Sequence, residues 1–265
     1  MTCWRGRSEM PRQIALIRVA VQFLTRFPVP GLRDFQPQWT ARSTRYFPLV
    51  GALVGFVSAG VFVAASEIWS GVLPALLAVA VGVLITGAFH EDGLADTLDG
   101  LGGGQTRGRR LEIMKDSRIG TFGVVGLGLT LAIKVAALEN LSASTGALAL
   151  VTAHAGGRAA AVIAMRLLPY AGDRDRAKVK PVADGVTSKE VFIAVLFAVF
   201  ALIPLLVVTP LTACVALAAG GAVATLMARA AAKLIGGWVG DTLGATEQMF
   251  EVGFLLACAG ALAFT

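Results

Sequence analysis

The run of 38 residues from 191 to 228 contains no charged side chain, and it constrains the fold more than any other feature. Residues 46–66 and 68–89 are likewise uncharged, with only Glu67 between them. A helix that crosses a bilayer needs about 20 predominantly apolar residues. Charged residues make up 15% of the chain, against about 25% in soluble domains. The sequence therefore predicts an all-α, polytopic membrane helix bundle. It excludes an ordinary soluble enzyme, a disordered chain and a nucleic-acid-binding domain.

The apolar runs fit about seven transmembrane helices, within a range of roughly six to eight. The predicted spans are 47–67, 72–89, 120–138, 145–168, two spans within 191–231 divided near Pro204 and Pro210, and a marginal span at 249–264. Residues 13–27 have apolar side chains at helical spacing, interrupted by Arg18 and Arg26. They predict a helix that lies at the cytoplasmic interface or packs on the bundle. We expect one membrane domain over 1–265, with 1–45 as a cytoplasmic or interfacial segment.

The basic residues orient the chain in the bilayer. Residues 1–45 hold eight Lys or Arg, and 107–118 and 174–189 hold five each, whereas 67–73 and 139–144 hold none. Positive residues remain on the cytoplasmic side of a membrane, so the net charge of +6 indicates topology and not a nucleic-acid partner. The predicted cytoplasmic loops are 90–119, 169–190 and 232–248.

An acidic cluster stands at the end of the second predicted span. Asp92, Asp96 and Asp99 are spaced i, i+4 and i+7, which places them on one face of a helix. Carboxylates gathered at the end of a membrane span repel one another and are costly to desolvate. A divalent cation removes this cost, and oxygen ligands suit Mg²⁺ or Mn²⁺. A solvated helix end is the plain alternative, but Leu94 and Leu98 between the aspartates are apolar.

A glycine run and a basic segment follow the aspartates. Gly102, Gly103 and Gly104 allow backbone N–H groups to approach an anion, and five Lys or Arg side chains lie within 107–118. Taken alone, this pattern is typical of any cytoplasmic loop. Beside a metal site it favours phosphoryl-group transfer, in which acidic residues hold a metal and basic residues hold phosphates.

Other polar residues lie in or next to apolar segments. His154 and Arg158 fall inside the span at 145–168, where an ionisable residue is functional by default, although Arg158 alternatively neutralises an internal carboxylate. Asp241 and Thr242 lie in a glycine-rich turn that is either a loop or part of the site. Lys134 is expected to snorkel to the outer interface.

These segments together resemble the adenosylcobinamide-GDP ribazoletransferase family, the cobalamin synthases. The resembling segments are 23–28, 47–51, 92–100, 110–121, 154–158 with 166–169, and 240–245. They cover nearly the whole chain in the right order. The combination of the aspartate-rich segment with residues 115–121 is the most specific part of the resemblance.

The resemblance implies a Mg²⁺-dependent, multi-pass transferase of the bacterial inner membrane whose active site faces the cytoplasm. Its substrates would be adenosylcobinamide-GDP and α-ribazole or α-ribazole 5′-phosphate, and GMP would be released. The implied metal ligands are Glu91, Asp92, Asp96 and Asp99. The implied substrate- and phosphate-binding residues are Arg110, Lys115, Arg118, His154, Arg158 and Thr242. The general base is one of the carboxylates Asp92, Asp96, Asp99 or Asp241, with His154 as a weaker candidate, and the sequence does not decide between them.

Three other classes share part of this pattern. A CDP-alcohol phosphotransferase has a motif that starts like residues 96–100, but the Ala-Arg pair that should follow is missing. A membrane prenyltransferase carries a second aspartate-rich motif, of which Asp241 with Glu247 is a poor version. A cation transporter places its carboxylates near the bilayer midplane. The released product separates these classes: GMP, CMP, pyrophosphate or ion flux.

Overall fold

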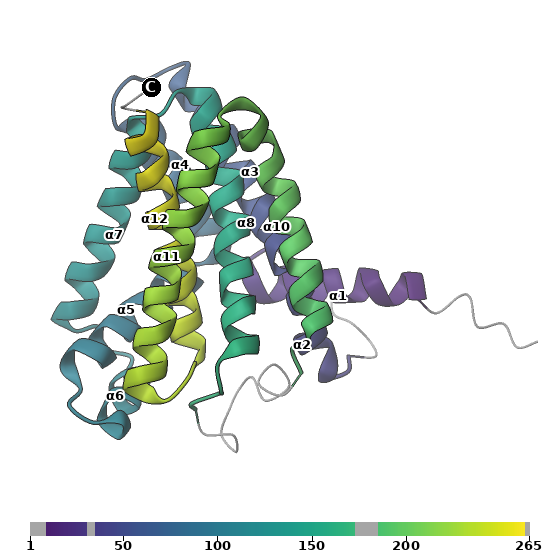
Figure 1. The fold of residues 1–265 in the computed structure, drawn as a ribbon, viewed down its shortest axis with the longest axis vertical. Helices are drawn as coiled ribbons and strands as arrows, with labels where there is room; N and C mark the ends of the chain where they lie inside the picture. Colours follow the sequence, from purple (N-terminus) through teal and green to yellow (C-terminus); the bar gives the residue numbers. More distant parts are fainter. Residues whose placement is uncertain (1–8, 31–34, 173–184, 263–265) are drawn as a thin grey trace, which may run out of the picture.

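A computed structural model describes residues 9–30, 35–172 and 185–262, which form a bundle of helices (Figure 1). The helices are α1 (Glu9–Leu24), α2 (Gln38–Ser43), the 3₁₀ helix η1 (Thr44–Tyr46), α3 (Phe47–Ser66), α4 (Leu73–Thr86), α5 (Phe89–Gly103), α6 (Arg107–Ile113), α7 (Thr121–Glu139), α8 (Ala143–Leu167), α10 (Ser188–Val208), α11 (Pro210–Ile235) and α12 (Gly240–Leu262). The described ranges contain no β-strand, only an isolated bridge between Tyr170 and Trp238. The predicted all-α fold is confirmed. The predicted loop 169–190 lies largely outside the described residues.

Five helical segments are long and apolar enough to cross a bilayer: Gln38–Ser66, α7, α8, α10 and α11. Helices α4 and α5 add a sixth span if they are counted together, although they are bent by 90°. The two spans predicted within 191–231 are α10 and α11, and Pro204 lies inside α10. The chain is therefore a multi-pass membrane protein. Residues 249–262 of the marginal span predicted at 249–264 lie in α12, which begins earlier, at Gly240, and is not among these apolar segments.

Helix α12 lies at the centre of the bundle, where it contacts α5, α7, α8 and α11 (Figure 1). Its buried residues change in character along its length. Asp241 stands in the first turn, Glu247 and Glu251 are buried near the middle, and Phe254 and Cys258 are buried farther along. Three acidic residues in one central helix show that α12 serves more than apolar packing.

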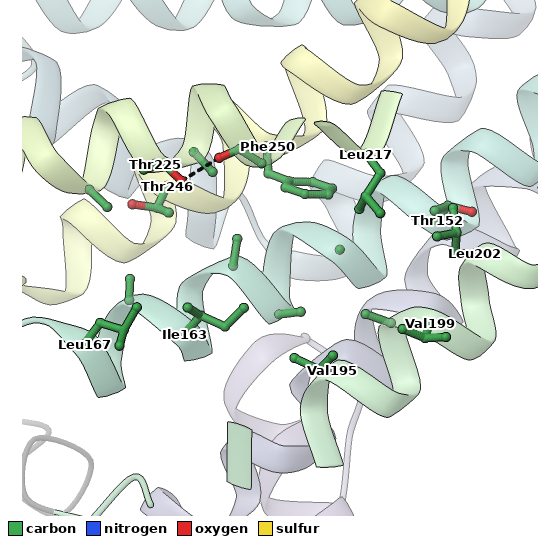
Figure 2. A pocket seen from close by; sticks show the side chains of 18 of the residues that line it. Thr152, Ile163, Leu167, Val195, Val199, Leu202, Leu217, Thr225, Thr246 and Phe250 are labelled. Carbon is green, nitrogen blue, oxygen red and sulfur yellow. Dashed lines mark hydrogen bonds between the residues drawn. The ribbon is translucent and has the colours of Figure 1, made fainter. Parts of the chain in front are cut away.

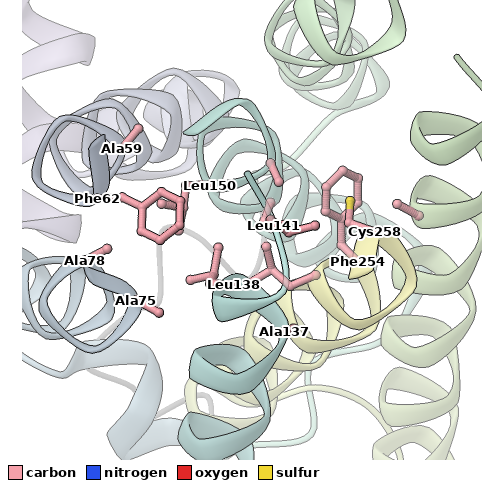
Figure 3. Close-up of a cluster of buried hydrophobic side chains, with 14 of the residues drawn as sticks. Ala59, Phe62, Ala75, Ala78, Ala137, Leu138, Leu141, Leu150, Phe254 and Cys258 are labelled. Carbon is pink, nitrogen blue, oxygen red and sulfur yellow. The ribbon is translucent and has the colours of Figure 1, made fainter. Parts of the chain in front are cut away.

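The largest apolar core occupies the half of the bundle farther from α5 and α6. Phe62 from α3, Ala75 from α4, Leu138 from α7, Leu150 from α8 and Phe254 from α12 all belong to it and are nearly inaccessible (Figure 3). Lipid is as apolar as these side chains, so close packing and not water exclusion holds helices together in a membrane. This core fixes one end of the bundle and leaves the other end for polar groups.

Helices α3 and α8 approach each other closely through two glycines. A β-carbon on Gly51 would lie 2.3 Å from the backbone oxygen of His154, and one on Gly55 would lie 2.7 Å from that of Leu150. Glycines four residues apart are a common contact motif between membrane helices because they let backbones meet. This contact fixes the position of α8, which carries His154 and Arg158.

A sharp turn separates α4 from α5. Gly87 and Ala88 have φ values of 67° and 58°, and Ala88 is the one described non-glycine residue with positive φ. A left-handed alanine costs roughly 1–2 kcal/mol. The turn gives the 90° bend between the two helices, so α5 does not continue the line of α4.

Helix α1 lies across the bundle and packs on its side (Figure 1). Leu16, Ala20 and Leu24 are buried in one cluster with Phe47 of α3 and Ala194 of α10. Residues 13–27 were expected either to lie at the cytoplasmic interface or to pack on the bundle. The structure shows that α1 packs on the bundle.

Candidate active site

The predicted aspartates stand on α5, and the start of α12 lies against them. Asp92 is exposed, Asp96 is half-buried and Asp99 is buried. Asp241, in the first turn of α12, is half-buried. The structure thus gathers the acidic cluster from two helices that are far apart in the sequence.

Two glycines bring these helices together. A β-carbon on Gly93 would lie 2.9 Å from the backbone oxygen of Asp241, and one on Gly244 would lie 3.1 Å from that of His90. A side chain at Gly93 would force the backbone to shift, and one at Gly244 would be tightly crowded. The glycines therefore set the distance between α5 and the turn that carries Asp241.

The carboxylates of the acidic cluster repel one another. Burial is the largest cost to the charged form of Asp96. Repulsion by three carboxylates adds to it, in decreasing order from Asp241, Asp92 and Asp99. Asp92 acts likewise on Asp241. Asp92, Asp96 and Asp241 belong to none of the ion pairs found among the described residues. Within residues 9–30, 35–172 and 185–262, no ion pair therefore neutralises these three carboxylates.

This donor set fits a magnesium ion. Mg²⁺ usually binds through one or two carboxylates together with waters and substrate phosphates, not in a closed cage of protein ligands. In the described chain, no three carboxylates of the acidic cluster bring their oxygens within 4.8 Å of one another. An open site of oxygen donors at a helix end is consistent with a cation shared with a diphosphate.

Asp99 has a different environment from the other aspartates. Its Oδ2 accepts the backbone N–H of Gly120 at 2.7 Å, and its Oδ1 accepts that of Gly123 at 2.8 Å. Free N–H groups at the start of a helix are well satisfied by a carboxylate. Asp99 therefore anchors the start of α7 on α5.

The predicted basic residues lie at the same end of the molecule. Lys115 and Arg118 are exposed, and Arg118 forms an ion pair of 2.7 Å with Asp116. Hydrogen bonds from Arg118 lower the pKa of Asp116 to about 2. Arg110 instead donates to the backbone oxygen of Leu234, at the end of α11. Lys115 and Arg118 are thus the predicted basic residues of this segment that are open to an anionic substrate.

Thr242 closes the first turn of α12. The backbone N–H of Val239 donates to the Thr242 hydroxyl at 2.9 Å, and the hydroxyl donates back to the Val239 oxygen at 2.9 Å. The side chain is 1% exposed. Thr242 therefore shapes the turn that presents Asp241.

A buried network of charged and polar side chains fills the middle of the bundle. Lys134 of α7 contacts Glu251 at 2.5 Å. His154 lies 2.6 Å from Glu251, and Arg158 reaches Glu247 at 2.5 Å and Glu251 at 3.1 Å. All five residues are at most 8% exposed. The structure thus places His154 and Arg158 with the carboxylates of α12. For Arg158 this is the alternative role stated above, in which it neutralises an internal carboxylate.

Gln248 joins this network to α5. Its amide donates to Glu91 at 2.9 Å and to Glu247 at 3.0 Å, while its oxygen accepts a hydrogen bond from Lys134 at 3.1 Å. Glu91 is 5% exposed. The structure therefore brings Glu91 into the buried network and separates it from the exposed face of Asp92.

His154, Glu247 and Glu251 form the one group of three metal-ligating side chains within 4.8 Å among the described residues. Arg158 and Lys134 already supply two positive charges to these carboxylates. A buried charge is retained where partners compensate it. The group is therefore an ion-pair network and not a second metal site.

Sequence reasoning missed the partners within this network. The expectation that Lys134 snorkels to the interface is wrong, because its amine is buried against Glu251 and Gln248. The available signal was the presence of opposite charges in separate apolar helices. Lys134 in 120–138 and Arg158 deep in 145–168, with two glutamates near 249, require internal pairing.

Comparison with known proteins gives a consistent result. Residues 16–259 match the profile of a family described as cobalamin-5-phosphate synthase. A protein of Leptothrix cholodnii called adenosylcobinamide-GDP ribazoletransferase is 44% identical over 242 residues, covering 89% of this chain and 92% of that protein. Proteins of the same name from Bradyrhizobium diazoefficiens and Shewanella frigidimarina are 41% and 40% identical, and each alignment covers more than nine-tenths of both chains. No solved structure matches.

Proposed function

The chain belongs to the cobalamin-5-phosphate synthase family, and from this premise we propose the reaction that it catalyses. It is a transferase of cobalamin biosynthesis, as its relatives' names indicate. The proposed donor is adenosylcobinamide-GDP, and the acceptor is α-ribazole or α-ribazole 5′-phosphate. The products are adenosylcobalamin, or its 5′-phosphate, and GMP.

The reaction breaks a phosphoanhydride bond and forms a phosphate ester bond. A ribose hydroxyl of the acceptor attacks the phosphorus that is bonded to cobinamide. The bond between this phosphorus and the bridging oxygen breaks, and GMP leaves with the electron pair. The hydroxyl proton passes to a carboxylate of the acidic cluster, for which Asp241 on the facing helix is one candidate.

The acidic cluster would hold Mg²⁺ through Asp92 and Asp96 of α5, with Asp241 of α12 facing them. When bound, Mg²⁺ neutralises charge on the diphosphate and on the leaving GMP. Lys115 and Arg118 would contact phosphate oxygens from the adjoining segment. Glu91 and the buried network would hold α5 in register with α12, and Asp99 would fix α7.

The observation that carries this proposal is the convergence of α5 and α12. Gly93 lies directly against Asp241, and the negative charges of both helices act on Asp96. A carboxylate cluster that lacks ion pairs among the described residues, at the same end of the molecule as exposed basic residues, suits a substrate that brings both a metal and phosphate groups. Apolar packing does not require this arrangement.

GMP release from purified protein in detergent tests the proposal. The assay contains adenosylcobinamide-GDP, α-ribazole 5′-phosphate and Mg²⁺, with EDTA as the metal control. We expect GMP only when both substrates and Mg²⁺ are present. Asp96→Asn should abolish turnover but leave membrane insertion intact. Glu67→Gln, which changes an exposed acid next to α3, should retain full activity.

Other products would overturn the proposal. CMP release from a CDP-alcohol, pyrophosphate release from a prenyl diphosphate, or ion flux in vesicles would each support another class. Full activity of Asp96→Asn would remove the metal site from α5 but leave the family reaction in place.

We also propose that the active site faces the cytoplasm from the bacterial inner membrane. Residues 107–118, which include α6, hold five basic side chains, and this favours the cytoplasmic side for the end of the bundle with α5 and α6. Labelling of single cysteines at Gln105 and Ser70, two exposed positions, tests this in a cysteine-free background. Only position 70 should react with an impermeant reagent in intact spheroplasts, and labelling of position 105 there would reverse the topology.

A further inference from the structure

A recessed apolar groove lies between α8, α10 and α11, with α12 as its floor (Figure 2). Its volume is about 550 Å³. Ile163, Val195, Val199, Leu217 and Phe250 point toward this space from the four helices (Figure 2). Small residues on α8 and α11 leave room between the larger ones. The groove is therefore a slot within membrane-spanning helices.

The groove is separate from the acidic cluster. Successive residues of an α-helix are rotated by about 100°, so Thr246 and Phe250 stand about 140° and about 180° around α12 from Asp241. Thr246 and Phe250 line the groove, whereas Asp241 lies against Gly93 of α5. The occupant of the groove is therefore not the diphosphate of the proposed reaction.

The length and position of the groove indicate where it lies in the bilayer. It extends along α8 from Thr152 to Leu168, a rise of about 24 Å at 1.5 Å per residue. Leu168 lies just past the end of α8 on the side of the acidic cluster, and Thr152 lies near the middle of the helix. The groove is therefore longer than one leaflet, which is roughly half of the 30 Å hydrocarbon core, and it begins at the interface on the side of the acidic cluster.

One cation stands at the mouth of the groove. Arg229 lines it from α11 and is exposed. Within the described ranges, Arg229 belongs to none of the ion pairs. It lies six residues before the end of α11, and long basic side chains near helix ends extend to the headgroup region. An apolar slot with one cation at headgroup depth matches a single-chain apolar ligand with an anionic head.

We propose that this groove binds one acyl chain of an anionic phospholipid from the leaflet on the side of the acidic cluster, with the lipid phosphate at Arg229. The chain occupies the slot between α8 and α11 and contacts Phe250 of α12. Bound in this way, the lipid packs against the helix that carries Asp241 on its opposite face. The inference rests on the groove alone and does not depend on the proposed reaction.

Gly221 provides a variant that fills the groove without a clash. It lines the groove, and a β-carbon built on it meets no atom within 4 Å. Gly221→Leu therefore places a side chain in the slot. Gly128→Leu on α7 is the matched control, because a β-carbon at Gly128 also meets no atom within 4 Å and the residue lies outside the groove.

Native mass spectrometry of delipidated protein, titrated with phosphatidylglycerol and with phosphatidylcholine, tests the proposal. We expect wild type and Gly128→Leu to bind one phosphatidylglycerol at least tenfold more tightly than phosphatidylcholine. Gly221→Leu should lose this lipid, and Arg229→Gln should bind both lipids equally. Unchanged binding by Gly221→Leu, or an unchanged preference in Arg229→Gln, would overturn the proposal.

A second measurement uses wild-type protein and so does not depend on folding of the variants. Phosphatidylglycerol with a photoreactive group on its acyl chain should crosslink to residues of the groove, such as Ile163 and Leu217. Crosslinks spread evenly over the exposed faces of α7 and α10 would show ordinary surrounding lipid and overturn the site. Crosslinks between two copies of the chain through the groove would assign it to self-association and also overturn the proposal.

Discussion

The side-chain amide of Gln248 donates to Glu91 at 2.9 Å, although 157 positions separate the two residues. This bond ties the central helix to the helix that carries the acidic cluster. On one side of it lies the buried network of Lys134 and Glu251, and on the other lies the meeting of Gly93 with Asp241. The position of the acidic cluster therefore depends on polar contacts deep in the bundle.

The contact between Gly93 and Asp241 should not tolerate a methyl group. In Gly93→Ala, the new β-carbon would lie 2.9 Å from a backbone oxygen, so α5 and α12 must separate. We expect GMP release to fall at least about tenfold, since small misplacements of catalytic groups are costly. Gly128→Ala, with no atom within 4 Å of its β-carbon, should keep full activity. Equal activity of the two variants would show that α5 and α12 can move apart freely.

Asp99 and Asp96 should respond differently to the same substitution. Asp99→Asn leaves one acceptor for two backbone N–H groups, and a buried unsatisfied donor costs about 1–3 kcal/mol. We therefore expect Asp99→Asn to lower the apparent Tm in detergent. Asp96→Asn should lose activity with an unchanged or higher Tm, because it removes a repelled charge. A Tm for Asp99→Asn equal to that of wild type would argue against its anchoring of α7.

Glu251 should be the most costly carboxylate to neutralise. Glu251→Gln removes the partner of Lys134, His154 and Arg158, and breaking a buried ion pair costs about 3–5 kcal/mol. Thermal unfolding in detergent should show a large decrease in Tm. The control Glu112→Gln breaks an exposed pair with Arg109 and should change Tm very little. Simultaneous Lys134→Met and Glu251→Gln should recover part of the loss, and no recovery would contradict the pairing.

Arg118 should affect substrate binding more than stability. Arg118→Ala removes an exposed cation, and we expect KM for adenosylcobinamide-GDP to rise about tenfold, the effect of one charge-assisted hydrogen bond of about 1.5 kcal/mol. Arg109→Ala on the neighbouring helix α6 is the matched control. The same KM for wild type and Arg118→Ala would remove Arg118 from the phosphate site.

The pH dependence of this effect follows from Asp116. Its pKa is lowered to about 2 in the folded protein by Arg118, so the ion pair is fully present above the usual carboxyl pKa and is lost as pH falls through about 2. The KM ratio of Arg118→Ala to wild type should therefore be constant from pH 6 to pH 9. A ratio that changes across this range would point to another titrating group beside Arg118.

The positions of the helices could be read from the sequence, because an apolar run of bilayer length has few other stable conformations. The span expected at 47–67 is α3, Phe47–Ser66, and the spacing of the aspartates placed them on one helix. The turn at Ala88 was not predictable, since a left-handed alanine has no sequence signature. The partner of Lys134 was not predictable either. Hydropathy indicates how deep the lysine lies in the membrane, but not which helix faces it.

The buried network also has a consequence for when the bundle can assemble during translation. Lys134 and Arg158 precede their carboxylate partners by 117 and 89 residues. At about 5–20 residues per second of translation, Arg158 waits roughly 4–18 s for Glu247. Each basic side chain placed at the bilayer centre costs about 2.5–3.5 kcal/mol during insertion. Glu91 is made before either cation and acts on Lys134 through space, whereas Arg158 gains its carboxylates only when α12 leaves the ribosome. Assembly of this bundle therefore waits for α12, and a chain truncated before α12 holds cations in lipid without their counter-charges.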